Sequence, residues 1–114
     1  MSKKYLLTLD LKDNPELIQQ YEEHHKAVWP EVLLSIKESG IQNMEIYRLG
    51  NRLCMIMETA DDFTFERKGK LDALSPKVAA WEELMWTYQQ PLRGAAEGEK
   101  WMQMNKIFDF KNTI

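Results

Sequence analysis

The sequence predicts an α+β fold with the element order βαββαβ. Segments that alternate apolar and polar side chains, typical of strands, lie at residues 3–12, 41–49, 52–59 and 101–110. Helical periodicity fills the gap after the first strand and the gap before the last one. This order is that of a split βαβ unit, which forms an antiparallel four-stranded sheet with helices on one face. With 44% hydrophobic residues, the chain (1–114) is expected to be a single domain with one core.

The first helix is expected to start at Asn14 and Pro15, an N-cap residue followed by proline in the first turn. Pro30 cannot donate a backbone hydrogen bond, and it disfavours helical geometry at Trp29. We therefore expect a kink at Trp29, a restart at Pro30 and an end at Gly40. Four side chains share the inward face of the first half at helical spacing, namely Leu17, Tyr21, His25 and Val28.

Two more helices are expected after the hairpin. Asp61 or Asp62 is the expected cap of a short one. Ser75 and Pro76 repeat the cap-plus-proline signal and open a helix expected to reach about Gln90. The last strand, 101–110, carries large apolar residues on one side, namely Met102, Met104, Phe108 and Phe110.

Composition and charge narrow the classes of function. A net charge of −3 gives no reason to expect a nucleic-acid partner. The sequence has no basic amphipathic helix, which would favour a membrane surface, and no run of roughly 18–20 apolar residues, which a membrane span requires. It therefore does not predict membrane contact. The lone Cys54 lies in an apolar run and is expected to behave as a small core residue in a reducing, cytoplasmic compartment. The sheet face away from the helices also carries apolar residues, so we expect a homodimer to cover it.

No nucleotide-binding, nucleophile-elbow or zinc-protease motif is present, so neither a cofactor nor a metal is expected. His24 and His25 are adjacent and would project about 100° apart on a helix, which is poor geometry for one ion. His25 lies one turn after Tyr21 on the inward face. A neutral imidazole there suits proton transfer near neutral pH. The alternative is an interior histidine bonded to a backbone carbonyl.

Three segments together resemble one known family. They are YEEHHKAVWPEV (21–32), GIQNMEIYRLGNRLCMIMET (40–59) and WEELM (81–85). The chain resembles the L-rhamnose mutarotase family and its L-fucose mutarotase-like relatives, essentially from end to end. The resemblance implies a dimeric, ferredoxin-like α+β barrel that interconverts the α and β anomers of a 6-deoxy-L-sugar without a cofactor.

The resemblance also implies roles for individual residues. The family's catalytic histidine falls on His25, its sugar-binding tyrosine on Tyr21, and the first of its paired tryptophans on Trp81. Glu82 stands where the second tryptophan is usual, and Met44 where a second sugar-contacting tyrosine is usual. The sequence Asn-Met-Glu at 43–45 is more similar to that of the fucose-type relatives, which favours L-fucose or a related deoxy sugar.

Mutarotation moves one proton off the anomeric hydroxyl and another onto the ring oxygen, and His25 can serve both steps. Trp81 would offer an apolar surface to the sugar, and Met44 would suit its C6 methyl group. Glu82 is the first candidate for a second acid–base group; Glu45 and Tyr21 are the others.

Two other classes remain open from the residues alone. One is a non-catalytic small-ligand-binding domain, and the other is a different cofactor-free enzyme such as a monooxygenase of aromatic substrates. The polar set Tyr21, His25 and Glu82 favours a polyol ligand over an aromatic one.

Overall fold

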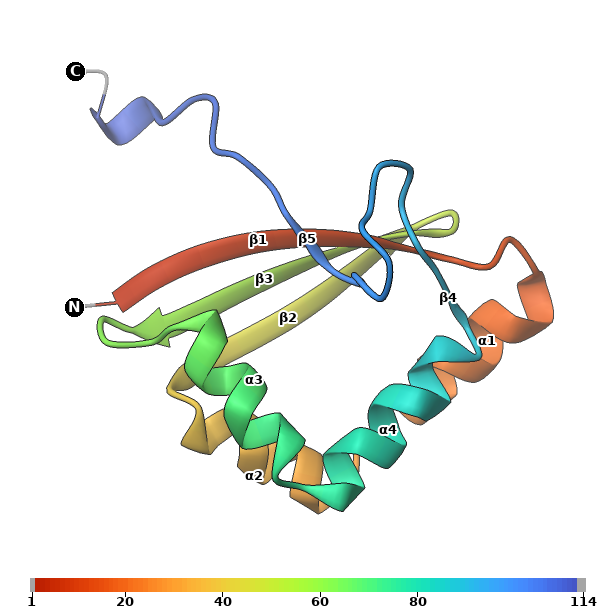
Figure 1. Ribbon diagram of the computed structural model, residues 1–114. Coiled ribbons are helices and arrows are strands. Elements are labelled where there is room, and N and C mark those ends of the chain that lie inside the picture. Colours follow the sequence, from red (N-terminus) through yellow and green to blue (C-terminus); the bar gives the residue numbers. More distant parts are fainter. Residues whose placement is uncertain (1, 113–114) are drawn as a thin grey trace.

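The computed structural model describes residues 2–112, which form a curved sheet with helices on one face (Figure 1). The strands are β1 (Ser2–Leu11), β2 (Ile41–Leu49), β3 (Arg52–Ala60), β4 (Gln89–Gln90) and β5 (Met102–Gln103). The helices are α1 (Pro15–His24), α2 (Pro30–Glu38), α3 (Phe65–Ala73), α4 (Pro76–Trp86) and the 3₁₀ turn η1 (Phe110–Asn112). The predicted α+β fold is confirmed.

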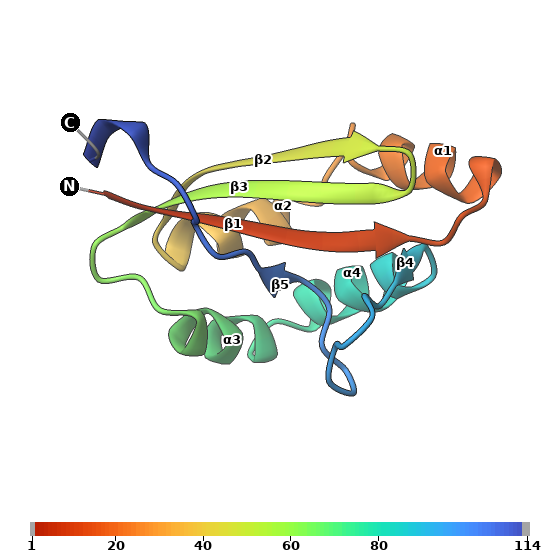
Figure 2. The ribbon, with the colours of Figure 1, turned by 90° about the horizontal axis from the view of Figure 1, so that it is seen from above.

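The sheet is antiparallel with the order β2-β3-β1-β4, and β5 joins the same edge of β1 as β4 (Figure 2). Gly50 allows the tight β2–β3 turn because its φ of 61° is in the left-handed region. The position expected for one long fourth strand is shared by two short ones. The sheet is nevertheless antiparallel, as expected, with β1 and β3 in the middle.

The expected kink at Trp29 is a complete break. The helix α1 ends at His24, and the next turn tightens, since the N–H groups of His25 and Lys26 donate to carbonyls three residues back. Trp29 has an extended conformation (φ −60°, ψ 138°), as expected before a proline, and α2 starts at Pro30. Residues 25–29 therefore form a non-helical connection, and α1 and α2 are separate helices.

Two of the three expected helix caps are correct. The Asn14 side chain accepts hydrogen bonds from the backbone of Glu16 and Leu17, and the Ser75 hydroxyl accepts one from Val78. Asp61 and Asp62 are not the cap of α3.

The cap of α3 is Thr64, whose hydroxyl accepts from the Arg67 N–H at 3.1 Å. The turn after β3 first buries Phe63, whose N–H donates to the Ala60 carbonyl. The helix therefore starts after that residue.

The C-terminal expectations are partly wrong. The helix α4 ends at Trp86 instead of reaching Gln90, because Gln89 and Gln90 leave it to pair with the end of β1. The expected strand 101–110 pairs only through β5, and the following arm (104–112) rises on the sheet face opposite the helices (Figure 1). Ile107 on this arm is 95% exposed. The alternating pattern indicates an apolar face that is expected to be buried, but the described residues of this chain do not cover that face.

The core lies between sheet and helices. Leu11 of β1 and Leu53 of β3 are fully buried in one cluster with residues of the helices. Leu9 is fully buried on the same side of β1 as Leu11. Cys54 is not among these residues. It alternates with Leu53 and Met55, so it lies half-buried on the opposite sheet face.

We expect Leu9→Ala to lower the free energy of unfolding by about 2–5 kcal/mol, since the side chain is 0% exposed and its loss leaves a cavity. Leu49→Ala is the matched control. Leu49 is 87% exposed, so its truncation should change stability by no more than about 0.5 kcal/mol. Urea unfolding followed by circular dichroism measures both, and equal losses would contradict this description of the core.

Candidate active site

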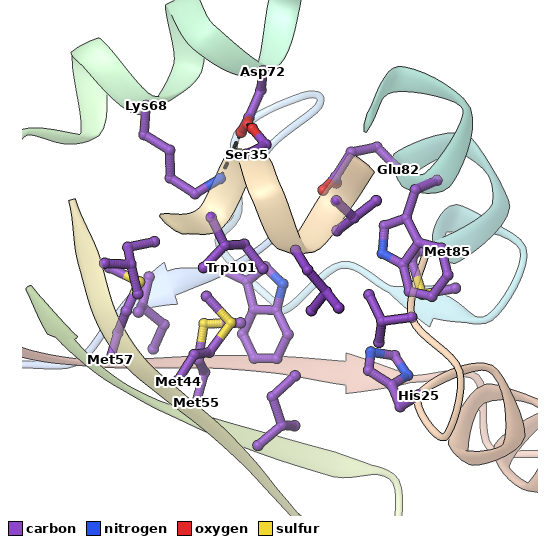
Figure 3. A pocket seen from close by; sticks show the side chains of 18 of the residues that line it. His25, Ser35, Met44, Met55, Met57, Lys68, Asp72, Glu82, Met85 and Trp101 are labelled. Carbon is purple, nitrogen blue, oxygen red and sulfur yellow. Dashed lines mark hydrogen bonds and ion pairs between the residues drawn. The ribbon is translucent and has the colours of Figure 1, made fainter. Parts of the chain in front are cut away.

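A cavity of about 1410 Å³ opens between the sheet and the helices (Figure 3). All five predicted site residues line it, although they come from α1, β2, α4 and the turn after α1: Tyr21, His25, Met44, Trp81 and Glu82. Glu45 does not line it. That side chain is exposed, and its carboxylate accepts a hydrogen bond from the Tyr47 hydroxyl at 3.3 Å. The structure therefore brings together the predicted set and leaves out Glu45, one of the three candidates for the second acid–base group.

His25 sits at the C-terminal end of α1, with its ring tied back onto the helix. Its Nδ1 lies 2.9 Å from the backbone oxygen of Tyr21, which is free because the His25 N–H donates to Glu22 instead. A carbonyl oxygen can only accept, so Nδ1 carries the hydrogen. In the neutral ring, Nε2 is then the acceptor. The described residues place no hydrogen bond on Nε2.

Aromatic rings on two sides hold the imidazole in place. The ring of Tyr21 is tilted against it at 4.4 Å between centroids, and Trp81 meets it edge-on at 5.7 Å. Trp81 is itself buried and packs edge-on against Trp29. Trp81 thus lines the cavity with little of its ring exposed, and it contacts both His25 and Trp29.

The cavity keeps its two principal proton-carrying groups uncharged at neutral pH. Burial lowers the pKa of His25 below 6.5, opposed by the bond to the Tyr21 carbonyl and helped by the neighbouring His24. Burial also raises the pKa of Tyr21 to about 12, with the negative charge of Glu82 adding to the rise and the Gln89 side chain opposing it. Near pH 7, His25 is therefore a base and the Tyr21 hydroxyl is a donor.

Glu82 is held by Lys100, a residue from the irregular segment 91–101. The Lys100 ammonium donates to Glu82 Oε2 at 2.7 Å and to the Glu82 backbone oxygen at 2.9 Å. It also lies 4.8 Å from the centre of the Trp86 ring. These contacts fix one carboxylate oxygen and attach the segment to α4. The next residue, Trp101, reaches into the cavity (Figure 3).

Residues 2–112 contain neither a cluster of metal ligands nor a helix that could span a membrane. No three His, Cys, Asp or Glu side chains there lie close enough to share a metal ion. None of the helices in that part of the chain has the length and apolar character needed to cross a bilayer.

A family model described as L-rhamnose mutarotase matches residues 4–110. The chain belongs to the L-rhamnose mutarotase family. It is an enzyme of the isomerase class, an aldose mutarotase.

Individual relatives agree with this placement. An L-fucose mutarotase of Xanthomonas campestris pv. campestris is 44% identical, over 93% of this chain and 86% of that protein. A UPF0734 protein of Dictyostelium discoideum is 37% identical, over 94% and 89%.

Solved structures share the fold. The L-rhamnose mutarotase of Formosa agariphila gives a TM-score of 0.67 at 17% identity, covering 95% of this chain and 98% of that one. Tetracenomycin F2 cyclase of Streptomyces glaucescens, a type-II polyketide cyclase, gives 0.56 at 16% identity, covering 95% and 96%.

Gln89, Lys100 and Trp101 are among the residues at the candidate site that the sequence does not indicate. The sequence predicts Gln89 to lie in the helix that reaches about Gln90, and Trp101 to lie in the strand 101–110. Local periodicity therefore says only which face of the element each side chain occupies. Gln89 is buried in the cavity wall, and the described residues offer its Oε1 no hydrogen-bond partner. No short-range sequence pattern indicates these three residues, because the position of each depends on the path of the chain after α4.

We expect the pKa of His25, followed by its imidazole NMR signals, to lie below 6.5 in the folded mutarotase and to return to about 6.5 in urea. The unfolded chain then binds more protons than the folded one between these two values. This group's contribution therefore makes stability fall as pH drops through that window, and its slope disappears above about pH 8, where both states are deprotonated. A folded pKa at or above 6.5 would contradict the burial described here.

Proposed function

We propose that this mutarotase interconverts the α and β anomers of a 6-deoxy-L-hexose, L-fucose first and L-rhamnose second, with His25 as the general acid–base group. The observation that carries the proposal is the single fixed tautomer of His25. Its Nδ1–H is committed to the Tyr21 carbonyl, so Nε2 remains for a ligand in a cavity that keeps the ring neutral.

The reaction can be written with this chain's groups. Nε2 accepts the proton of the anomeric hydroxyl as the bond from C1 to the ring oxygen breaks and C1 becomes an aldehyde. The ring oxygen receives a proton, either from the imidazolium so formed or from a neighbouring donor such as the Tyr21 hydroxyl. Rotation about C1–C2 and reversal of these transfers close the ring on the other face. Protons balance, and no electron carrier is needed.

The remaining cavity groups suit a neutral sugar with one apolar end. Lys100 occupies Oε2 of Glu82, and among the described residues nothing is bonded to Oε1, which is available to a sugar hydroxyl. Met44 and Met85 offer flexible apolar surface to the C6 methyl group.

L-fucose is favoured over L-rhamnose by two observations. Met44 and Glu82 replace the tyrosine and tryptophan usual in the rhamnose pattern, and both line the cavity. The relative at 44% identity also carries the name L-fucose mutarotase.

We expect His25→Gln to reduce the acceleration of anomer exchange by about 10²–10⁴-fold, the usual contribution of general acid–base catalysis. Saturation-difference NMR on L-fucose and L-rhamnose measures the rate. His24→Gln is the matched control, because the His24 Nε2 lies 3.0 Å from the Tyr88 hydroxyl and glutamine can keep a polar contact there.

Wild-type rates in His25→Gln would refute the catalytic assignment. A wild type that accelerates neither sugar would refute the proposed substrates.

We further propose that a second copy of the chain covers the sheet face away from the helices, in the reducing cytoplasm that a lone thiol favours. Leu6, Cys54 and Ile56 lie half-buried on that face, and Tyr47 is largely exposed there. The arm 104–112 adds apolar side chains on the same side of the sheet (Figure 1). Apolar surface of this kind is typical of homodimer interfaces.

Light scattering should then give about twice the 13.5 kDa of one chain. Ile56→Asp should shift the protein towards the monomer, because it places a charge in the centre of the proposed interface. Leu74→Asp, at an exposed site on the helical side, should leave the mass unchanged. A monomeric wild type at micromolar concentration would argue against the dimer.

A further inference from the structure

The cavity has a second polar end, away from His25. Ser35 of α2 donates from Oγ to Asp72 Oδ1 at 2.9 Å, and Lys68 of α3 donates from Nζ to Asp72 Oδ2 at 2.6 Å (Figure 3). All three line the same cavity as His25. Lys68 is only 22% exposed, so this ion pair is well shielded from water.

This cluster retains hydrogen-bonding capacity on the cavity side. Among the described residues, Lys68 Nζ donates only to Asp72, which leaves two N–H groups, and the Ser35 oxygen keeps its acceptor lone pairs. Lys68 and Asp72 cancel each other's charge. The cluster therefore suits neutral hydroxyl groups, which both donate and accept, better than a phosphate or carboxylate.

Apolar surface separates the two polar ends. Trp101 lies between them, with Met44 and Met55 on the facing strands (Figure 3). A half-buried indole is a suitable platform for the C–H face of a pyranose. The cavity volume of about 1410 Å³ also exceeds the roughly 300–1,000 Å³ of pockets that hold drug-sized ligands. One deoxyhexose would leave much of this space empty.

We propose that Ser35, Lys68 and Asp72 form a second sugar subsite, so that the enzyme takes reducing disaccharides as well as monosaccharides. The inference rests on the proposed function, because it places the reducing 6-deoxy-L-hexose at His25. Ring opening requires a free hydroxyl on C1. The second sugar must therefore be linked through another oxygen of the first, and its hydroxyls meet the Lys68 end.

The test compares binding of L-fucose with binding of disaccharides in which a hexose is linked to O3 or O4 of L-fucose. We expect calorimetry to give a Kd about tenfold lower for at least one disaccharide, the change that one hydrogen bond to a charged group produces. Equal or weaker binding of both disaccharides would overturn the subsite.

Two variants on α3 test whether the preference for a disaccharide comes from the Lys68 end of the cavity. Lys68→Met should remove the preference for the disaccharide and leave L-fucose binding and turnover unchanged. Lys70→Met is the matched control: Lys70 is 75% exposed and outside the cavity wall, so the preference should persist. If the cluster only ties α2 to α3, Lys68→Met will weaken both ligands equally or leave the preference intact, and the inference is then wrong.

Ser35→Ala provides a second variant should Lys68→Met fail to fold, and it should reduce the same preference. Turnover separates the two proposals. Acceleration of L-fucose exchange without any disaccharide preference contradicts only the subsite. A preference in binding without acceleration of either monosaccharide contradicts the proposed function.

Discussion

The hydrogen bond between His25 Nδ1 and the carbonyl of Tyr21 is the interaction on which the site depends. It exists because α1 ends early: Pro30 holds Trp29 in an extended conformation, and the preceding turn tightens so that the Tyr21 oxygen loses its usual backbone donor. The imidazole replaces that donor. The early end of α1 thus accounts for the position of the ring, and Nε2 has no hydrogen bond to the described residues.

The sequence predicted the parts of this arrangement that depend on near neighbours. Asn14 and Ser75 announced two helices correctly because caps act within three residues. The spacing of Tyr21 and His25 placed both on the inward face for the same reason. A kink was expected at Trp29, but the helix ends five residues earlier. The restricted backbone geometry of one residue before a proline does not show how many preceding residues leave the helix.

The parts that depend on distant segments could not be predicted. Trp101 and Lys100 belong to a segment whose path is decided by contacts with α4, so their sequence neighbours carry no signal of a cavity. The arm after β5 shows the opposite case. Its alternating pattern was visible, but the surface that it pairs with is not supplied by the described part of this chain. The roles of the cavity residues remain predictions.

Position 82 differs from the pattern that the family resemblance implies. A tryptophan at position 82 would be apolar, whereas Glu82 brings a charge that Lys100 compensates, and the same contact holds the segment that delivers Trp101. Trp101 therefore adds an indole ring to the cavity from outside α4. Burial leaves His25 and Tyr21 in an environment that disfavours charge: the imidazole stays neutral and the tyrosine hydroxyl stays protonated near pH 7. Mutarotation starts and ends with a neutral sugar. In the reaction that we propose, a neutral base and a neutral donor create charge only while the proton is being transferred, when the opposite charges are close enough to stabilise one another.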